Sequence, residues 1–216
     1  YTFEGRPMPL AVIGAPDATP AAVLATGKTR VFIQGNIHAG EVEGKEALLW
    51  MLRSVAKGER ADWLRSVVLL ITPIYNADGN DAFGPQERNR GSQSGPASVG
   101  LRANGQGLDL NRDYIKQDAP ETRASSALLM AWDPDLFIDL HTTDGSYHGY
   151  VLTYATGLNP NSSPANDYIR DKLLPEVRAR MRSRHQQEVF SYGNFRNADP
   201  DSLAQGWETY DARPRF

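Results

Sequence analysis

The chain has 216 residues, of which 40% are apolar, so it can bury a full core, and we interpret residues 1–216 as one domain. The formal net charge of −3 argues against a broad positive surface for nucleic acid or an anionic membrane and favours small or peptide-like partners. No apolar run approaches the roughly 18 residues of a membrane span, and the absence of cysteine leaves His, Asp and Glu to hold any metal.

In the first part of the chain, apolar runs of strand length alternate with a helical pattern. The segment 17–27 is rich in Pro and Ala and is predicted to be a connection. The run at 66–75 is almost continuously apolar, which is typical of a strand covered on both faces of a parallel sheet. We predict strands at 7–15, 29–37 and 66–75, and a helix at 41–57 that ends before a glycine.

The pattern disappears from 76 to 106, where Gly, Asn, Ser and Arg are frequent. A structureless loop of this length is uncommon in a compact domain and is usually functional when it occurs. Beyond this loop, apolar periodicity returns. It predicts a helix at 120–131, strands at 135–141 and 148–155, and a long amphipathic helix at 164–185 that Pro175 kinks.

His38 and Glu41 stand where the predicted strand 29–37 ends and the next helix begins, which is where open α/β sheets keep their sites. An imidazole and a carboxylate at this spacing can converge on one cation, and nitrogen with oxygen suits Zn²⁺. A zinc site then needs a third ligand. His141, at the end of the predicted strand 135–141, supplies it in the same way. Either histidine alone would more often be a structural or surface residue.

Three motifs occur in a fixed order: His38-Ala39-Gly40-Glu41, Asp109-Leu110-Asn111-Arg112 and Asp139-Leu140-His141. With these motifs the chain resembles the zinc carboxypeptidase family, of carboxypeptidase A type, over residues 5 to about 155. The resemblance implies an α/β fold with a mixed, mostly parallel, twisted sheet flanked by helices. It also implies that the chain is a trimmed catalytic domain, incomplete at its C-terminal side.

The activity implied by the resemblance is hydrolysis of C-terminal peptide bonds in a peptide or small peptide-like substrate, through a zinc-activated water. The resemblance assigns one Zn²⁺ per chain to His38, Glu41 and His141. Three protein ligands leave one position open for water, as in catalytic zinc sites. Asp109 is implied to accept a hydrogen bond from the first metal histidine and so to fix its tautomer. A loop-capping role is the alternative for Asp109.

Asn111 and Arg112 match the pair that holds the terminal carboxylate of the substrate, a bidentate task that suits a guanidinium. The competing interpretation of Arg112 is a buried structural ion pair. For the arginine that polarises the scissile carbonyl, our choice is Arg102, just upstream in the same loop, with Arg90 in reserve. An exposed loop arginine is the alternative for both.

Two parts expected from the resemblance have no clear counterpart. The general-base glutamate should lie on a strand well after the third ligand. The late glutamates are Glu176, Glu188 and Glu208, and the last is a poor match because its flanks are polar. Tyr192 and Tyr210 are weak candidates for the gating tyrosine. We therefore expect the base to lie beyond this chain, which would bind zinc yet hydrolyse peptides slowly.

Two other functions stay open. One is a zinc-dependent deacylase of the aspartoacylase or succinylglutamate desuccinylase kind, whose motif usually reads His-Gly-Asn-Glu. This chain has His38-Ala39-Gly40-Glu41, which favours the peptidase. The other is a non-catalytic peptide- or sugar-binding module that retains the zinc site. The sequence does not determine the oligomeric state or the compartment, for which a periplasmic or secreted location is the expectation.

Overall fold

The computed structural model describes residues 1–91, 95–142, 150–157 and 163–192. The chain divides into two compact units, Tyr1–Gly145 and Ser146–Phe216. The interpretation of residues 1–216 as one domain therefore stays a prediction. Within the described residues, none of the helices combines the length and the apolar character that crossing a membrane requires.

The first unit is built on a four-stranded sheet with the order β1-β3-β2-β6. Its strands are β1 (Ala11–Ile13), β2 (Thr29–Gly35), β3 (Val67–Thr72) and β6 (Leu136–Leu140). β2 runs parallel to both β3 and β6, and β1 is antiparallel to β3. The mixed, mostly parallel sheet predicted from the sequence is therefore confirmed. The strands at 7–15 and 66–75 are shorter than predicted.

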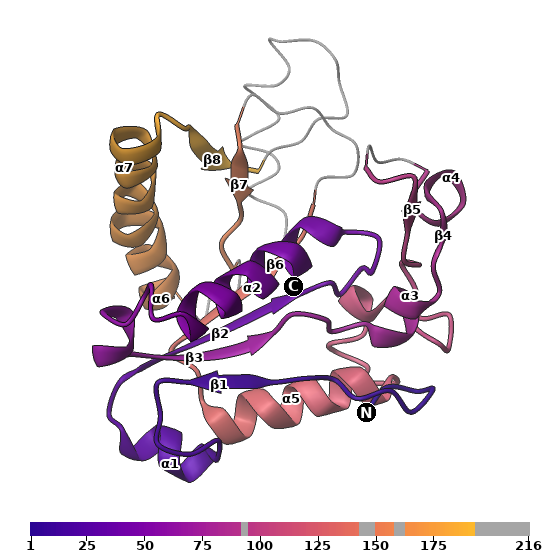
Figure 1. Cartoon of the computed structure of the whole chain (residues 1–216), viewed down its shortest axis with the longest axis horizontal. Helices are drawn as coiled ribbons and strands as arrows, with labels where there is room; N and C mark the ends of the chain where they lie inside the picture. The colour runs from indigo at the N-terminus through magenta and orange to yellow at the C-terminus, as the bar shows by residue number, and fades with distance from the viewer. Residues whose placement is uncertain (92–94, 143–149, 158–162, 193–216) are drawn as a thin grey trace. The chain divides into compact units, whose positions relative to one another are not determined.

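Helices cover both faces of this sheet (Figure 1). Alternate residues of β2 face opposite ways, so that Ile33 packs with Leu48 and Val55 of α2 (Val42–Ala56). Its neighbour Phe32 packs instead in the cluster that includes Val23 of α1 (Pro20–Ala25) and Leu128 of α5 (Pro120–Trp132). In Figure 1, α2 lies above the sheet, and α1 and α5 lie below it. The helices predicted at 41–57 and 120–131 are confirmed.

The prediction that 17–27 is a simple connection is wrong, because this segment contains α1. Thr19 is the N-cap of the helix, and its hydroxyl oxygen accepts a hydrogen bond from the Ala22 N–H at 3.3 Å. Pro20 occupies the first turn, where a missing N–H costs nothing. Val23 is fully buried and anchors the helix to the sheet. The helix has only six residues, too few to show a periodic pattern.

The sequence predicted a structureless loop at 76–106. This prediction is wrong, because the segment contains short helices and strands. A helix begins after Asn76, whose side-chain oxygen accepts the Gly79 N–H at 2.9 Å. Its elements are short and local. They are α3 (Ala77–Asp81), β4 (Gly84–Pro85), α4 (Gln86–Asn89) and β5 (Ser98–Val99), with β4 antiparallel to β5. Short 3₁₀ turns occur elsewhere at η1 (Trp63–Arg65) and η2 (Leu110–Arg112).

The second unit contains a parallel pair of strands, β7 (Leu152–Tyr154) and β8 (Val189–Ser191). The predicted helix at 164–185 is present as α6 (Ser163–Tyr168), the π-helical turn η4 (Ile169–Leu173) and α7 (Leu174–His185). The π turn ends at Leu173, two residues before Pro175, which cannot donate a backbone hydrogen bond. β8 was not predicted.

Candidate metal centre

The turn between β2 and α2 places two of the predicted metal ligands. Asn36 begins it with a positive φ of 64°, a conformation that asparagine tolerates well. Its side-chain amide donates to the carbonyl of Ala39 at 3.0 Å, and the Glu41 N–H donates to the carbonyl of His38 at 2.9 Å. The turn is therefore closed on itself. His38 and Glu41 are both buried in it, with 3% and 2% of their surface exposed.

A close approach of α2 to β6 brings the third ligand to the same place. Gly35 at the end of β2 is paired with Leu140 at the end of β6. A Cβ atom at Gly44 of α2 would lie only 2.7 Å from the Leu140 Cβ, so a glycine is needed at this contact. Because Leu140 precedes His141 directly, the first turn of α2 and the end of β6 deliver Glu41 and His141 to one point.

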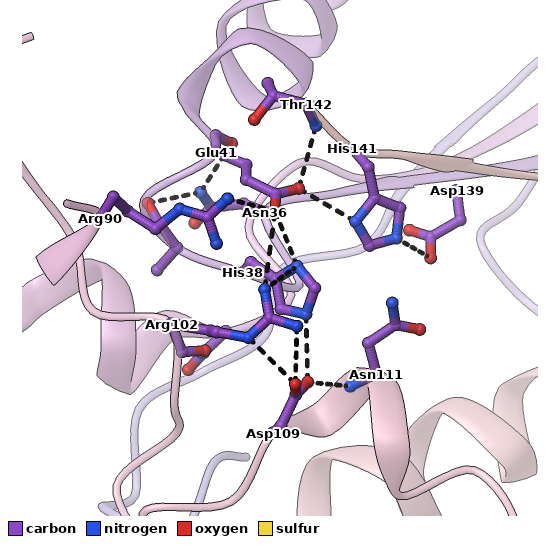
Figure 2. A network of polar contacts seen from close by, with 12 residues as sticks. Asn36, His38, Glu41, Arg90, Arg102, Asp109, Asn111, Asp139, His141 and Thr142 are labelled. Carbon is purple, nitrogen blue, oxygen red and sulfur yellow. Dashed lines mark hydrogen bonds and ion pairs between the residues drawn. The ribbon is translucent and has the colours of Figure 1, made fainter. Parts of the chain in front are cut away.

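The three predicted ligands converge, with their donor atoms all within 4.8 Å of one another. Glu41 lies between the two imidazoles (Figure 2): its Oε1 is 2.8 Å from His38 Nδ1, and its Oε2 is 3.0 Å from His141 Nδ1. Two imidazole nitrogens and one carboxylate form a donor set that fits Zn²⁺. His38 is buried, whereas 31% of the His141 side chain is exposed, so the cluster is open to solvent on one side.

Each imidazole has a second carboxylate behind its other nitrogen. Asp109 Oδ1 is 3.1 Å from His38 Nε2, and Asp139 Oδ2 is 2.9 Å from His141 Nε2. Each ring thus lies between two carboxylates, which only accept hydrogen bonds, and if Nδ1 were bound to a metal the carboxylate behind Nε2 would hold the ring N–H there. Asp109 Oδ1 also accepts the Asn111 N–H at 3.0 Å, so Asp109 makes both the predicted contact with His38 and the contact of a loop cap.

The two candidate arginines lie in different surroundings. Arg102 donates to Asp109 Oδ2 through Nε at 3.0 Å and Nη2 at 2.7 Å, and 34% of its side chain is exposed. Arg90 is buried, with its Nη2 2.9 Å from Glu41 Oε1. A Cβ atom at Gly40 would overlap the aliphatic carbons of Arg90, so the glycine makes room for this arginine. Arg102 is therefore partly open to solvent, whereas Arg90 is enclosed.

The charges around the cluster shift several pKa values. Burial raises the pKa of Glu41, but hydrogen bonds to His141 and His38 lower it more, so it stays well below its ordinary value. Burial also raises the pKa of Asp109, and the contacts with Arg102 and His38 outweigh it and hold that pKa low. Burial lowers the pKa of His141, but Asp139 and Glu41 raise it to about 10. The two carboxylates beside His141 therefore favour a positive charge on that ring.

Asn111 and Arg112 lie in η2, immediately after Asp109. Arg112 is exposed and donates from Nη1 to the carbonyl of Asn111 at 2.9 Å. The interpretation of Arg112 as a buried ion pair is therefore wrong. The next residue, Asp113, is buried and accepts the N–H groups of Asp118 and Ala119, each at 2.9 Å. These bonds tie the segment that carries Asn111 and Arg112 to the start of α5.

Three of the late residues named from the sequence, Glu176, Glu188 and Tyr192, lie in the second unit. Glu176 forms an ion pair with Arg180, and Glu188 pairs with Arg182 at 2.6 Å, each with side chains partly exposed. The backbone N–H of Tyr192 donates to the carbonyl of Tyr154 at 2.8 Å. Glu208 and Tyr210 lie outside the described residues. The expectation that the general base lies beyond this chain stays a prediction.

The sequence did not predict a role for Asp139 or the contact of Arg90 with Glu41. Asp139 stands two positions before His141, and residues at that spacing on a strand share a face, which is a local signal that was available. Arg90 and Glu41 are 49 positions apart, so no local pattern predicts their contact. The backbone N–H of Thr142 donates to Glu41 Oε2 at 3.0 Å, and this contact could not be predicted from a local pattern either.

Several known proteins that resemble this chain are carboxypeptidases. The chain is 33% identical over 149 residues to carboxypeptidase D of Rattus norvegicus, which covers 57% of this chain and 11% of that protein. A solved structure of a putative carboxypeptidase A from Shewanella denitrificans superposes with a TM-score of 0.62 at 23% identity, over 94% of this chain and 49% of that chain. A metallo-carboxypeptidase from Pseudomonas aeruginosa gives 0.60 at 20% identity, over 98% of this chain and 51% of that one.

At 20% and 23% sequence identity, the likeness to these solved structures shows only that the chain shares their fold. The chain spans about half the length of these solved structures and a small part of the curated relative. The model of the zinc carboxypeptidase family matches residues 1–119, which is more than half of the chain. The chain therefore belongs to the zinc carboxypeptidase family.

Proposed function

We propose that the protein is a zinc-dependent metallocarboxypeptidase that removes C-terminal residues from a peptide substrate. The observation that carries this proposal is the convergence of His38, Glu41 and His141 on one point that is partly open to solvent. His38 and His141 would hold one Zn²⁺ through Nδ1, and Glu41 would hold it through its carboxylate. When bound, zinc acidifies a coordinated water and polarises the carbonyl that is attacked.

Arg102 is proposed to stabilise the negative charge that forms on the carbonyl oxygen of the substrate. Its guanidinium is held through Nε and Nη2 by Asp109, which fixes the plane of the group. Its Nη1 lies 3.2 Å from His38 Nδ1, one of the proposed metal-binding atoms. A donor that is already fixed beside the reacting carbonyl needs no reorganisation when charge develops there.

Asn111 and Arg112 are proposed to bind the free carboxylate at the C-terminus of the substrate. Arg112 is exposed, and both residues directly follow Asp109, so they lie beside the segment that supports the centre. The similar protein from Pseudomonas aeruginosa is described in complex with (2-guanidinoethylmercapto)succinic acid, a ligand that carries carboxylates. The proposed general base is a glutamate outside the described residues.

The deacylase alternative has less support from the site. Its usual motif would place an asparagine at position 40, where even a Cβ atom would overlap Arg90. The buried contact between Arg90 and Glu41 thus fits the glycine of this chain. Measurement of turnover distinguishes an enzyme from the non-catalytic binding module.

The test compares hydrolysis of a peptide and of its C-terminal amide by the full-length protein loaded with zinc. We expect the amide to react at least about tenfold more slowly, because it cannot form the charge-assisted pair with Arg112. In Arg112→Ala the two substrates should react at nearly equal, low rates. Equal rates in the unsubstituted protein would contradict the carboxylate clamp. If the zinc-loaded protein hydrolyses no peptide, the peptidase proposal is contradicted. Turnover of N-acyl amino acids would then favour a deacylase, and no turnover of either substrate would favour a binding module.

A further inference from the structure

The carboxylate behind His141 is itself held by a buried amide on the neighbouring strand. Gln34 of β2 is paired in register with Asp139 of β6 and has no exposed surface. Its Nε2 donates to Asp139 Oδ1 at 3.0 Å and to the Tyr114 hydroxyl oxygen at 2.8 Å. Asp139 Oδ2 in turn contacts His141 Nε2 at 2.9 Å. These four residues, Tyr114, Gln34, Asp139 and His141, form what we call the polar relay.

We propose that Asp139 and Gln34 are positioning residues for the third metal ligand: Asp139 holds His141 with Nδ1 directed at the metal, and Gln34 holds Asp139. The inference rests on the proposed metal centre. It assigns functions to two residues that do not themselves contact the metal.

The chemistry of the groups permits only one arrangement of the relay. An ionised carboxylate accepts hydrogen bonds and cannot donate them, so Gln34 must turn its NH₂ group, and not its oxygen, toward Asp139. The Tyr114 hydroxyl accepts the second N–H of the same amide. Burial raises the pKa of Tyr114 above its ordinary value, so this hydroxyl remains neutral. Both amide protons are used, which locks the side chain of Gln34 in one orientation.

Strand geometry explains why the relay acts on His141 in particular. Asp139 of β6 stands two positions before His141, a spacing at which side chains of an extended chain share one face, and Gln34 is the cross-strand neighbour of Asp139. The Asp139 side chain is 23% exposed, so without Gln34 it could turn toward water. His141 is the more exposed of the two histidines and depends more on such support.

The two histidines of the centre are supported in different ways. Asp109, behind His38, is neutralised by the guanidinium of Arg102. Asp139, behind His141, accepts a hydrogen bond from the neutral amide of Gln34, which brings no positive charge. A more anionic partner makes the imidazole a more basic ligand. We therefore expect zinc binding by His141 to depend more strongly on Asp139 than zinc binding by His38 depends on Asp109.

The experiment measures zinc affinity of the full-length protein by competition with a chelator of known affinity, together with thermal unfolding of the metal-free form. Asp139→Asn should weaken zinc binding about 10- to 100-fold, and Gln34→Met at least about fivefold. The absorption spectrum of the cobalt-substituted protein should change in both variants, because the His141 ring is no longer fixed. The metal-free forms should remain folded.

Asp135→Asn is the matched control, at the residue that directly precedes β6. Asp135 accepts hydrogen bonds from the backbone and the guanidinium of Arg30 at the other end of β6. This variant should unfold at a lower temperature yet bind zinc as the unsubstituted protein does. Equal zinc affinity in folded Asp139→Asn would overturn the inference and leave the metal centre standing. If Asp139→Asn does not fold, unchanged affinity and cobalt spectrum in Gln34→Met decide against it. Failure of the unsubstituted protein to bind zinc would overturn the metal centre as well.

Discussion

Arg102 places two guanidinium nitrogens on a single oxygen of Asp109, with Nε at 3.0 Å and Nη2 at 2.7 Å from Oδ2. The other oxygen of the same carboxylate is 3.1 Å from Nε2 of His38. One aspartate thus orients a proposed metal ligand and the arginine proposed to stabilise the transition state. The two tasks can be separated by substitution because they use different oxygens.

Replacement of Arg102 by alanine should lower kcat of the full-length protein about 10²- to 10³-fold, as expected for loss of a fixed oxyanion donor. Zinc content should not change, because Arg102 is not a ligand. Steady-state kinetics and metal analysis on the same preparation give both values. Asp109→Asn is the companion variant and should lower both activity and zinc affinity. A loss of zinc in Arg102→Ala equal to that in Asp109→Asn would show that the arginine acts only through the metal.

Replacement of Arg90 by methionine should affect stability more than catalysis. Arg90 is buried with Glu41, and removal of one member of a buried ion pair leaves the other charge uncompensated. We expect the free energy of unfolding of the metal-free protein to fall by about 3 kcal/mol, at the lower end for such pairs because Glu41 keeps both imidazoles. Urea unfolding measures this. Arg53→Met, on α2, is the control, and its free energy of unfolding should stay within about 0.5 kcal/mol of the unsubstituted protein. An equally small change for Arg90→Met would contradict the buried pair.

Asp113 should make stability depend on pH in the acid range. Burial raises the pKa of this carboxyl, but the N–H groups of Ala119 and Asp118 lower it more, so the folded-state pKa lies below the ordinary value. A depressed pKa stabilises the fold above the unfolded pKa of about 3.9, and this stabilisation is lost as the pH falls through the folded pKa. The difference in unfolding free energy between the unsubstituted protein and Asp113→Asn should therefore be largest near pH 6 and shrink toward pH 3. A difference that is constant over this range would assign the effect to packing alone.

The elements with long, repeated patterns were predictable from the sequence. α2 has buried Leu48 and Val55 at helical spacing, and Gly58, with a φ of 79°, follows its end. β3 is a run of apolar residues buried between two layers of helices. α1 was missed, although Thr19 and Pro20 carry the signals of a helix start, because a single turn and a half has no period to detect.

The residues of the site that lie in sequence motifs could be predicted, whereas the contacts that depend on strand pairing could not. His38, Glu41, Asp109 and His141 were predicted from ordered motifs, and the structure brings their side chains close together. The pairing of Gln34 with Asp139 depends on the register of two strands 105 positions apart, which no local pattern encodes. Arg90 reaches Glu41 only because the short elements between 77 and 99 return the chain to the centre.

The zinc content and affinity of the full-length protein test the metal centre most directly. Equilibrium dialysis against zinc, followed by metal analysis, should give one Zn²⁺ per chain at this centre, and His141→Ala should lose most of it because the two remaining ligands hold the ion poorly. His185→Ala, a change at an exposed histidine at the end of α7, serves as the control and should bind as the unsubstituted protein does. Zinc bound with equal affinity by the unsubstituted protein and by His141→Ala, or no zinc bound by either, would contradict the assignment of His38, Glu41 and His141 as the ligands.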